Sequence, residues 1–342
     1  MGLSDPNRQG GIFNVNFPNS HLINFYLETD VYLSEEENSS PILLELPVDI
    51  AYAGSPFVHI PNAFDADGDR LEYRLAEPLM NMGLPALNYQ QVDEVNPGAN
   101  NVINIDSETG LLSWDAPQTP GPYVIAIEIL SYRNGEVNGR VLRDMQIEVF
   151  PQQNLIPSIG FSGVGNNEIN EVFPGDVISI NVASQDPVDP ASTVQLSSSS
   201  PLYFVVSPPA TFESNGDGTA TFEWVVTDDL VREEPYQVVF QATDLSALAN
   251  YTVARFKVSP RMVSTLNIED QKIKVFPNPV HDQLNIHLPQ LSQNEIEIFD
   301  ATGKYLSKTQ IENGQRLDVS GLVPGTYYFK LSDGRTASFI KL

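Results

Sequence analysis

The chain has 342 residues, with 44 acidic and 18 basic side chains, and its formal net charge at pH 7 is −26. This charge repels phosphate backbones and anionic headgroups, so neither nucleic-acid binding nor direct membrane insertion is expected. The sequence has no cysteine and only four histidines, and no apolar run reaches the ~18 residues of a membrane-spanning helix. Disulfides and thiolate metal sites are thereby excluded, and catalytic zinc is not expected.

Short runs rich in Val, Ile, Tyr and Phe alternate along the chain with 26 prolines and 22 glycines. Because few stretches keep a helical period, this pattern predicts an all-β protein of short strands and turns. At roughly 100 to 150 residues per domain, the length allows two to three domains. Residues 1–40 contain only two strand-like pieces, at residues 11–15 and 25–27, and are predicted to be the remnant of a truncated upstream β module.

The next part of the chain contains a weak repeat, which predicts two similar domains at residues 41–150 and 152–260. Each copy has, in order, an acidic turn, a strand that ends in Trp114 or Trp224, and a strand that opens with Pro-Tyr. About seven short strands in roughly 100 residues are typical of immunoglobulin-like sandwiches. In that fold each lone tryptophan is expected in the core rather than on a ligand-binding surface.

The acidic turn of the first copy offers three carboxylates, Asp65, Asp67 and Asp69, around Gly68. Hard oxygen donors on one tight turn suit Ca²⁺, although the glycine position differs from that of an EF-hand loop. An ordinary solvated turn of Asp and Gly is the alternative. With the later segment Ile105-Asp106-Ser107-Glu108-Thr109-Gly110, this turn makes residues 1–150 similar to cadherin-like modules of secreted bacterial surface proteins. That resemblance implies a bound Ca²⁺ that rigidifies the turn or the junction between modules.

A break in composition sets the end of the chain apart. Residues 272–342 have 8 basic and 7 acidic side chains, whereas the rest of the chain carries the whole acidic excess. Such a break marks a domain boundary, and residues 261–271 are predicted to be the linker. Alternating strands and a hairpin turn at Asp333-Gly334 predict a small β-sandwich, in which Pro277-Asn278-Pro279 ends the first strand.

Four motifs follow one another in this tail. They are Val275-Phe276-Pro277-Asn278-Pro279, residues 296–304 with Gly303, residues 317–328 with Gly325 and Tyr327, and the terminal Lys341-Leu342. With these motifs, residues 273–342 resemble the C-terminal sorting domain of the type IX secretion system. The resemblance implies a sorting signal that includes Pro277, Asn278, Pro279, Gly303, Gly325, Tyr327 and Lys341. It also implies that the secretion machinery is a partner and that the protein is secreted or displayed on the outer cell surface. An ordinary binding sandwich is the alternative.

An exported protein needs an N-terminal secretion signal, and the first six residues have neither a basic start nor an apolar core. We therefore expect residue 1 to be an internal start of a longer product. Since Gly-x-Ser-x-Gly and a phosphate-binding loop are absent, no enzymatic activity is expected. The sequence predicts a structural or adhesion protein whose tandem modules act as a spacer or bind an extracellular protein or glycan. The alternative is a non-catalytic, carbohydrate-binding or spacer part of a larger secreted enzyme.

Overall fold

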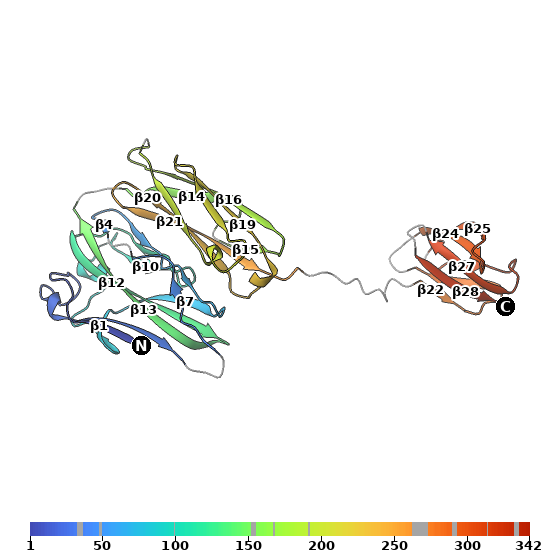
Figure 1. The fold of residues 1–342 in the computed structure, drawn as a ribbon, viewed down its shortest axis with the longest axis horizontal. Helices are drawn as coiled ribbons and strands as arrows, with labels where there is room; N and C mark the ends of the chain where they lie inside the picture. The colour runs from blue at the N-terminus through green and yellow to red at the C-terminus, as the bar shows by residue number, and fades with distance from the viewer. Residues whose placement is uncertain are drawn as a thin grey trace. The chain divides into compact units, whose positions relative to one another are not determined.

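The computed structural model describes residues 1–342 apart from positions 33–36, 48–49, 99, 152–154, 167, 191, 262–272, 289–292, 313 and 332–334. The chain divides into two compact units, Met1–Arg261 and Met262–Leu342. Nearly all regular structure consists of β-strands (Figure 1), so the all-β prediction is confirmed. None of the helices in the described part of the chain has the length and apolar character of a membrane span. The predicted linker, residues 261–271, lies outside the described residues except for Arg261.

The first sandwich of the unit Met1–Arg261 is built on two long neighbouring strands, β12 (Gly121–Arg133) and β13 (Glu136–Phe150). Its eight-stranded sheet also contains β7 (Arg70–Ala76), β2 (Phe25–Val31), β8 (Leu79–Asn81), β9 (Leu84–Pro85), β1 (Gly2–Asp5) and β4 (Ile50–Tyr52). The second sheet consists of β10 (Ile103–Ile105), β11 (Leu112–Trp114) and β5 (Phe57–His59), and β3 (Ile42–Leu43) pairs separately with β6 (Ala63–Phe64).

The core of this sandwich contains side chains from both sheets. Trp114 is 1% exposed, packs edge-on against Tyr123 with ring centroids 5.2 Å apart, and donates its indole N–H to Asn101 Oδ1 at 2.6 Å. Ile125 and Ile147 complete the same cluster from β12 and β13. The expected core position of the tryptophan is therefore confirmed.

The described part of residues 1–40, predicted as the remnant of another module, lies instead within the first sandwich. Strand β2 pairs with β13, and Arg140 of β13 bonds Asp30 of β2 at 2.7 Å. Arg8 forms a buried ion pair with Asp144 at 2.6 Å. The Asn14 amide exchanges two hydrogen bonds with the backbone of Val124, at 2.7 and 2.9 Å. The two strand-like pieces are too short to form a sheet alone, and these long-range contacts complete them.

The second sandwich has two four-stranded sheets. One has the order β14 (Ser158–Ser162), β16 (Val177–Gln185), β19 (Thr219–Val225), β18 (Thr211–Ser214), and the other the order β15 (Ile169–Val172), β21 (Ala249–Val258), β20 (Tyr236–Thr243), β17 (Gln195–Ser199). Trp224 is again 1% exposed and packs edge-on against Phe256 at 5.6 Å between ring centroids. The helical turns of the unit are α1 (Val92–Val95), η1 (Ser20–Leu22), η2 (Pro201–Tyr203) and η3 (Asp228–Leu230).

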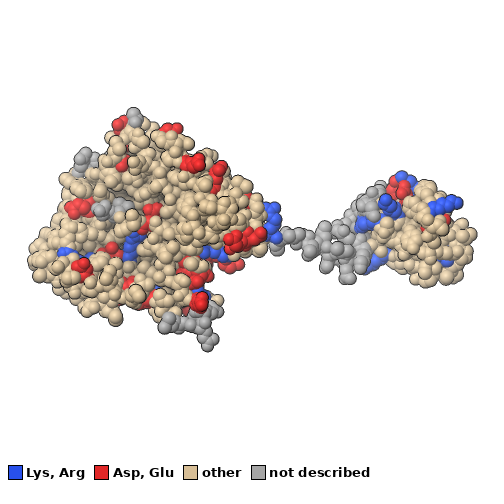
Figure 2. All heavy atoms as spheres, viewed as in Figure 1, with Lys and Arg blue, Asp and Glu red and all other residues tan. Residues whose placement is uncertain are grey.

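The unit Met262–Leu342 is a separate small sandwich. Its sheets have the orders β22 (Lys274–Phe276), β23 (Gln283–His287), β26 (Arg316–Asp318) and β25 (Tyr305–Glu312), β24 (Gln293–Asp300), β27 (Gly325–Leu331), β28 (Thr336–Lys341). Ile296 and Ile298 point into its core beside Phe329 and Phe339. The predicted turn at Asp333-Gly334 lies outside the described residues. Figure 2 shows that Lys and Arg lie on this small unit, whereas acidic residues are spread over the larger one.

Candidate functional site

In the small C-terminal unit, the Pro-Asn-Pro segment is hydrogen-bonded to the last strand. The Asn278 side chain accepts the N–H of Ile340 at 2.9 Å and donates to the carbonyl of Ser338 at 3.2 Å. Val280 donates its N–H to the Ile340 carbonyl at 2.8 Å and accepts the N–H of Leu342 at 2.9 Å. These four bonds cover the outer edge of β28, which would otherwise present unpaired backbone groups. We call this arrangement of Asn278, Val280, Ser338, Ile340 and Leu342 the terminal clasp.

The residue types of the clasp follow from its geometry. Pro277 and Pro279 have no backbone N–H, so the segment between them cannot form a regular ladder with β28. The carboxamide of Asn278 supplies one acceptor and one donor in place of the missing backbone groups. An aspartate or leucine at this position could not do both.

The other motif residues near β28 hold the strand before it. Tyr327 donates its hydroxyl to the carbonyl of Val323 at 2.7 Å, and its buried ring stacks on Phe339 with centroids 5.5 Å apart. Gly325 pairs with Lys341 at the start of β27. Lys341 is buried apart from its ammonium group, which bonds the Leu342 carbonyl oxygen at 2.6 Å. Prediction and structure thus bring Asn278, Tyr327 and Lys341 to one edge of the sandwich.

Gly303 is the one predicted signal residue that the structure places elsewhere. It follows β24 with a φ of +84°, in a turn that Asp300 closes. Asp300 Oδ1 accepts the Thr302 hydroxyl and the N–H of Lys304, and these bonds hold the pKa of Asp300 below its ordinary value. Gly303 therefore shapes the β24–β25 hairpin and does not contact the terminal clasp.

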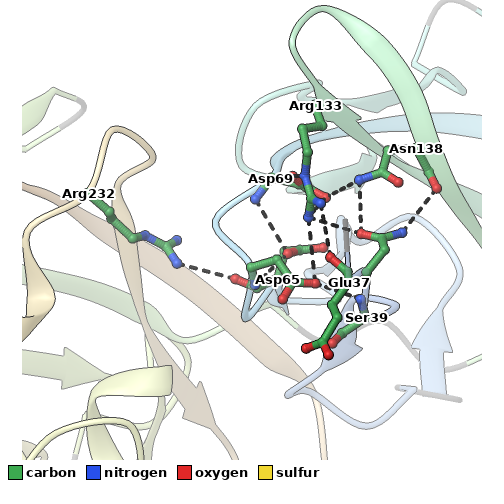
Figure 3. Close-up of polar contacts among 9 residues, drawn as sticks. Glu37, Ser39, Asp65, Asp69, Arg133, Asn138 and Arg232 are labelled. Carbon is green, nitrogen blue, oxygen red and sulfur yellow. Dashed lines mark hydrogen bonds and ion pairs between the residues drawn. The ribbon is translucent and has the colours of Figure 1, made fainter. Parts of the chain in front are cut away.

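The acidic turn of the first sandwich is organised around an arginine (Figure 3). Asp69 pairs with Arg133 through Nε–Oδ1 and Nη2–Oδ2 distances of 2.7 and 3.1 Å, and it also accepts the Asn138 amide at 2.5 Å. Asp67 accepts the N–H of Ser39 at 2.6 Å, and its carboxylate lies 3.7 Å from Arg133. Arg133 thus supplies positive charge at the place where a cation was predicted.

Asp65 differs from its two neighbours because it is buried, with 1% of its surface exposed. Its Oδ1 accepts the N–H groups of Asp67 and Asp69 at 2.9 and 3.4 Å, whereas Oδ2 is buried without a hydrogen-bond partner. Burial, and then the charge of Asp69, raise the pKa of Asp65. Over the described ranges, no group of three His, Cys, Asp or Glu side chains is arranged to hold a metal ion. As arranged, the turn does not fit Ca²⁺, which would have to displace Arg133.

The second sandwich contacts this turn through Arg232, which Figure 3 shows beside Asp65. Arg232 Nη1 donates to the Asp65 carbonyl at 3.2 Å. The guanidinium lies over the rings of Phe64 and Tyr236, at 5.1 and 4.3 Å from their centroids. Burial lowers the pKa of Arg232. The turn is therefore part of the junction between the sandwiches.

Residues 274–342 match the family described as the secretion system C-terminal sorting domain. The match covers the whole terminal clasp and all of the predicted signal residues. This unit is a type IX secretion sorting domain. The protein is therefore handled by the type IX machinery and exported to the outer surface or the medium.

Comparison of the whole chain gives fold neighbours only. No curated protein matches it in sequence. It is similar to cadherin domains 1–5 of protocadherin gamma B2, at 11% identity and a TM-score of 0.22, over 89% of this chain and 60% of that one. It is also similar to the human desmocollin-1 ectodomain (12%, 0.22, 93% and 66%) and to the tandem Ig repeats of Dlar (11%, 0.27, 65% and 98%). The chain spans less than two thirds of the first two.

Sequence reasoning missed several residues of these sites. In the sorting domain, Val280 is a lone apolar residue after Pro279, and that isolation is a signal that could have identified it as a core anchor. In the acidic turn, Arg133 and Asn138 lie beyond the turn in sequence, on either side of the β12–β13 hairpin. No local pattern connects them with Asp69, because β12 and β7 must pair before these side chains meet.

Proposed function

We propose that the protein is a non-catalytic structural and adhesion protein, in which two sandwiches form one rigid body that is exported by its sorting domain and presents a binding surface outside the cell. The observation that carries the proposal is the buried junction between the sandwiches of the unit Met1–Arg261. Flexible spacers join modules by exposed linkers with few contacts. A junction with its own core suits a protein that transmits force or presents surfaces in a constant orientation.

The centre of the junction is apolar. Ile60 from the first sandwich packs against Val239, Ala249 and Tyr251 from the second, and all four are buried. Phe64 of the first sandwich belongs to the core cluster of the second. Burial of this surface stabilises the pair by about 25 cal/mol per Å² of apolar area removed from water.

Polar contacts around that centre set the register of the two sandwiches. Asn62 donates to the Ser199 hydroxyl at 2.8 Å, and Gln237 donates to the Thr109 carbonyl at 3.1 Å. Arg255 pairs with Glu108 at 2.7 Å. Hydrogen bonds between side chains and backbone have strict geometry, so they oppose sliding of one sandwich over the other.

The export step is tested in a host with type IX secretion. Residues 262–342 are fused behind a signal peptide and a fluorescent protein, and the intact tail is compared with Asn278→Leu and with the matched surface control Gln310→Ala. We expect the intact tail and Gln310→Ala to export the reporter and Asn278→Leu to leave most of it in the periplasm. Equal export by all three would refute a role for the terminal clasp.

Adhesion is tested with the full chain behind a signal peptide. Strains that display it at the surface are compared, for attachment to surfaces and to other cells, with a strain that displays the sorting domain alone. More attachment by the full chain is expected. Equal attachment at equal surface levels would refute the adhesion role while leaving the export assignment intact.

A further inference from the structure

Two loops of the first sandwich contain no charged residue. Residues 9–24 and 78–92 have neither Asp, Glu, Lys nor Arg, in a chain whose net charge is −26. Charged residues are otherwise spread along the chain up to residue 261, so two neutral stretches that meet in space form an unusual part of this surface.

Hydrogen bonds join the two loops directly. The Asn14 amide donates to the Gln90 carbonyl at 3.1 Å, and the Gln90 N–H donates to the Asn14 carbonyl at 3.0 Å. Asn88 donates to Asn16 Oδ1 at 3.0 Å. Beneath them Ile12, Val15, Ile23, Ala86 and Val124 form a buried cluster shared by both loops. The loops are therefore one ordered surface, which we call the neutral loop surface (residues 9–24 and 78–92).

The side chains that this surface exposes are apolar groups and amides. Met82 at the tip of the β8–β9 hairpin is 76% exposed, Leu22 is 68% exposed, and Phe17, Leu84 and Leu87 are exposed as well. The exposed amides are those of Gln9, Asn19, Asn24, Asn81, Asn88 and Gln90. Exposed apolar groups gathered on one surface mark an interaction site more often than scattered ones do.

The position of the neutral loop surface leaves it accessible. In Figure 1 the dark blue N-terminal loop lies at one end of the unit Met1–Arg261, and the chain leaves that unit near β15 at the other end. A partner can therefore bind the neutral loop surface without meeting the segment that leads towards the sorting domain.

We infer that the neutral loop surface binds the same surface of a second copy of this chain. Two copies of an acidic protein repel each other wherever their charged surfaces meet, and this effect is smallest where neither copy carries charge. Amides donate and accept hydrogen bonds at once, and apolar groups match apolar groups, so this surface is complementary to itself in a two-fold arrangement. A surface rich in one sign of charge cannot be. Association of copies through this end gives the proposed adhesion protein a partner, and it can be measured on the purified chain whether or not that proposal holds.

The test is the oligomeric state of the full chain by sedimentation velocity, from about 1 µM to about 300 µM. We expect a monomer–dimer equilibrium that becomes tighter when salt rises from about 0.05 M to about 0.5 M, because salt screens the repulsion between acidic copies. The double variant Met82→Asp with Leu87→Asp should weaken it by at least about tenfold, since it places like charges in the interface. Leu245→Asp changes a residue that is 81% exposed in the second sandwich and serves as the matched control.

Tryptophan fluorescence and circular dichroism check that each variant is folded. A monomer at every concentration and salt would overturn the inference, as would a dimer that the double variant leaves unchanged. If the chain is monomeric but binds uncharged polysaccharides such as a neutral glucan, and the double variant loses that binding, the surface belongs to a glycan and the inference is likewise overturned.

Discussion

His59 makes the junction between the sandwiches sensitive to acid. It is fully buried on β5, both of its ring nitrogens lack a hydrogen-bond partner, and its ring meets Tyr251 of the second sandwich edge-on, with centroids 6.3 Å apart. Burial, and then the positive charge of Arg143, lower the pKa of His59 from 6.5 to about 3. The folded protein therefore holds this imidazole neutral at pH values where the unfolded chain protonates it.

The size of the effect follows from the shift. Between pH 6.5 and pH 3 the unfolded state binds a proton that the folded state does not, so stability falls as pH falls. At 1.36 kcal/mol per pH unit, His59 lowers the free energy of unfolding by about 2 kcal/mol at pH 5, and by about 5 kcal/mol below pH 3. Burial also raises the pKa of Glu45, which faces the same region, and that carboxyl contributes with the opposite sign.

The measurement compares the full chain with His59→Leu, which is similar in volume and cannot be protonated. Urea unfolding is followed by tryptophan fluorescence at pH 7 and pH 5, with Trp114 reporting on the first sandwich and Trp224 on the second. We expect the variant to be at least as stable at pH 7, because it removes two unpartnered nitrogens, and to gain about 2 kcal/mol relative to the wild type at pH 5. Carboxyl groups titrate in both proteins and largely cancel. Identical pH dependence of the two proteins would refute the reasoning.

Three further predictions concern the larger unit. Arg8→Met should lower the free energy of unfolding by about 3 to 5 kcal/mol in urea, because it leaves Asp144 buried without its ion-pair partner, and an unchanged midpoint would contradict the burial of this pair. Calcium that binds the acidic turn competes with Arg133, so Arg133→Met should increase the rise in melting temperature that Ca²⁺ produces over chelator; an equal response in both proteins would show that the ion does not bind there. Gly163→Ala should cost about 1 to 3 kcal/mol more than Gly175→Ala, since both have positive φ but only at Gly163 would the new Cβ lie 2.4 Å from a backbone oxygen; equal losses by calorimetry would contradict the clash.

Local patterns were enough to predict the parts of the fold that depend on neighbours in sequence. A tryptophan at the end of a short apolar strand must be buried somewhere, and Trp114 and Trp224 are. The two prolines around Asn278 stop a strand wherever they occur, and the alternation at Ile296 and Ile298 identifies one inner face. These features follow from steric and hydrophobic rules that act over a few residues.

Features that depend on distant pairing could not be predicted in the same way. Whether residues 1–31 belong to the first sandwich depends on β13, more than 100 residues later, because β2 has no sheet without it. The three aspartates of the acidic turn look like a cation site until Arg133 arrives from the end of β12. Likewise, the polar side chains of the junction, Asn62 and Gln237 among them, follow no hydrophobic period and stand out only once the sandwiches are packed.

The terminal clasp also determines when the sorting domain can be complete. The segment after its first strand is held by Ser338, Ile340 and Leu342, so the first and last parts of the domain to be synthesised close it together. A nascent chain that stops before β28 leaves Phe339 out of the core and Asn278 without its partners. Folding of this unit therefore reports that translation has passed residue 336, and a prematurely ended polypeptide would lack the folded export signal before it reached the secretion machinery.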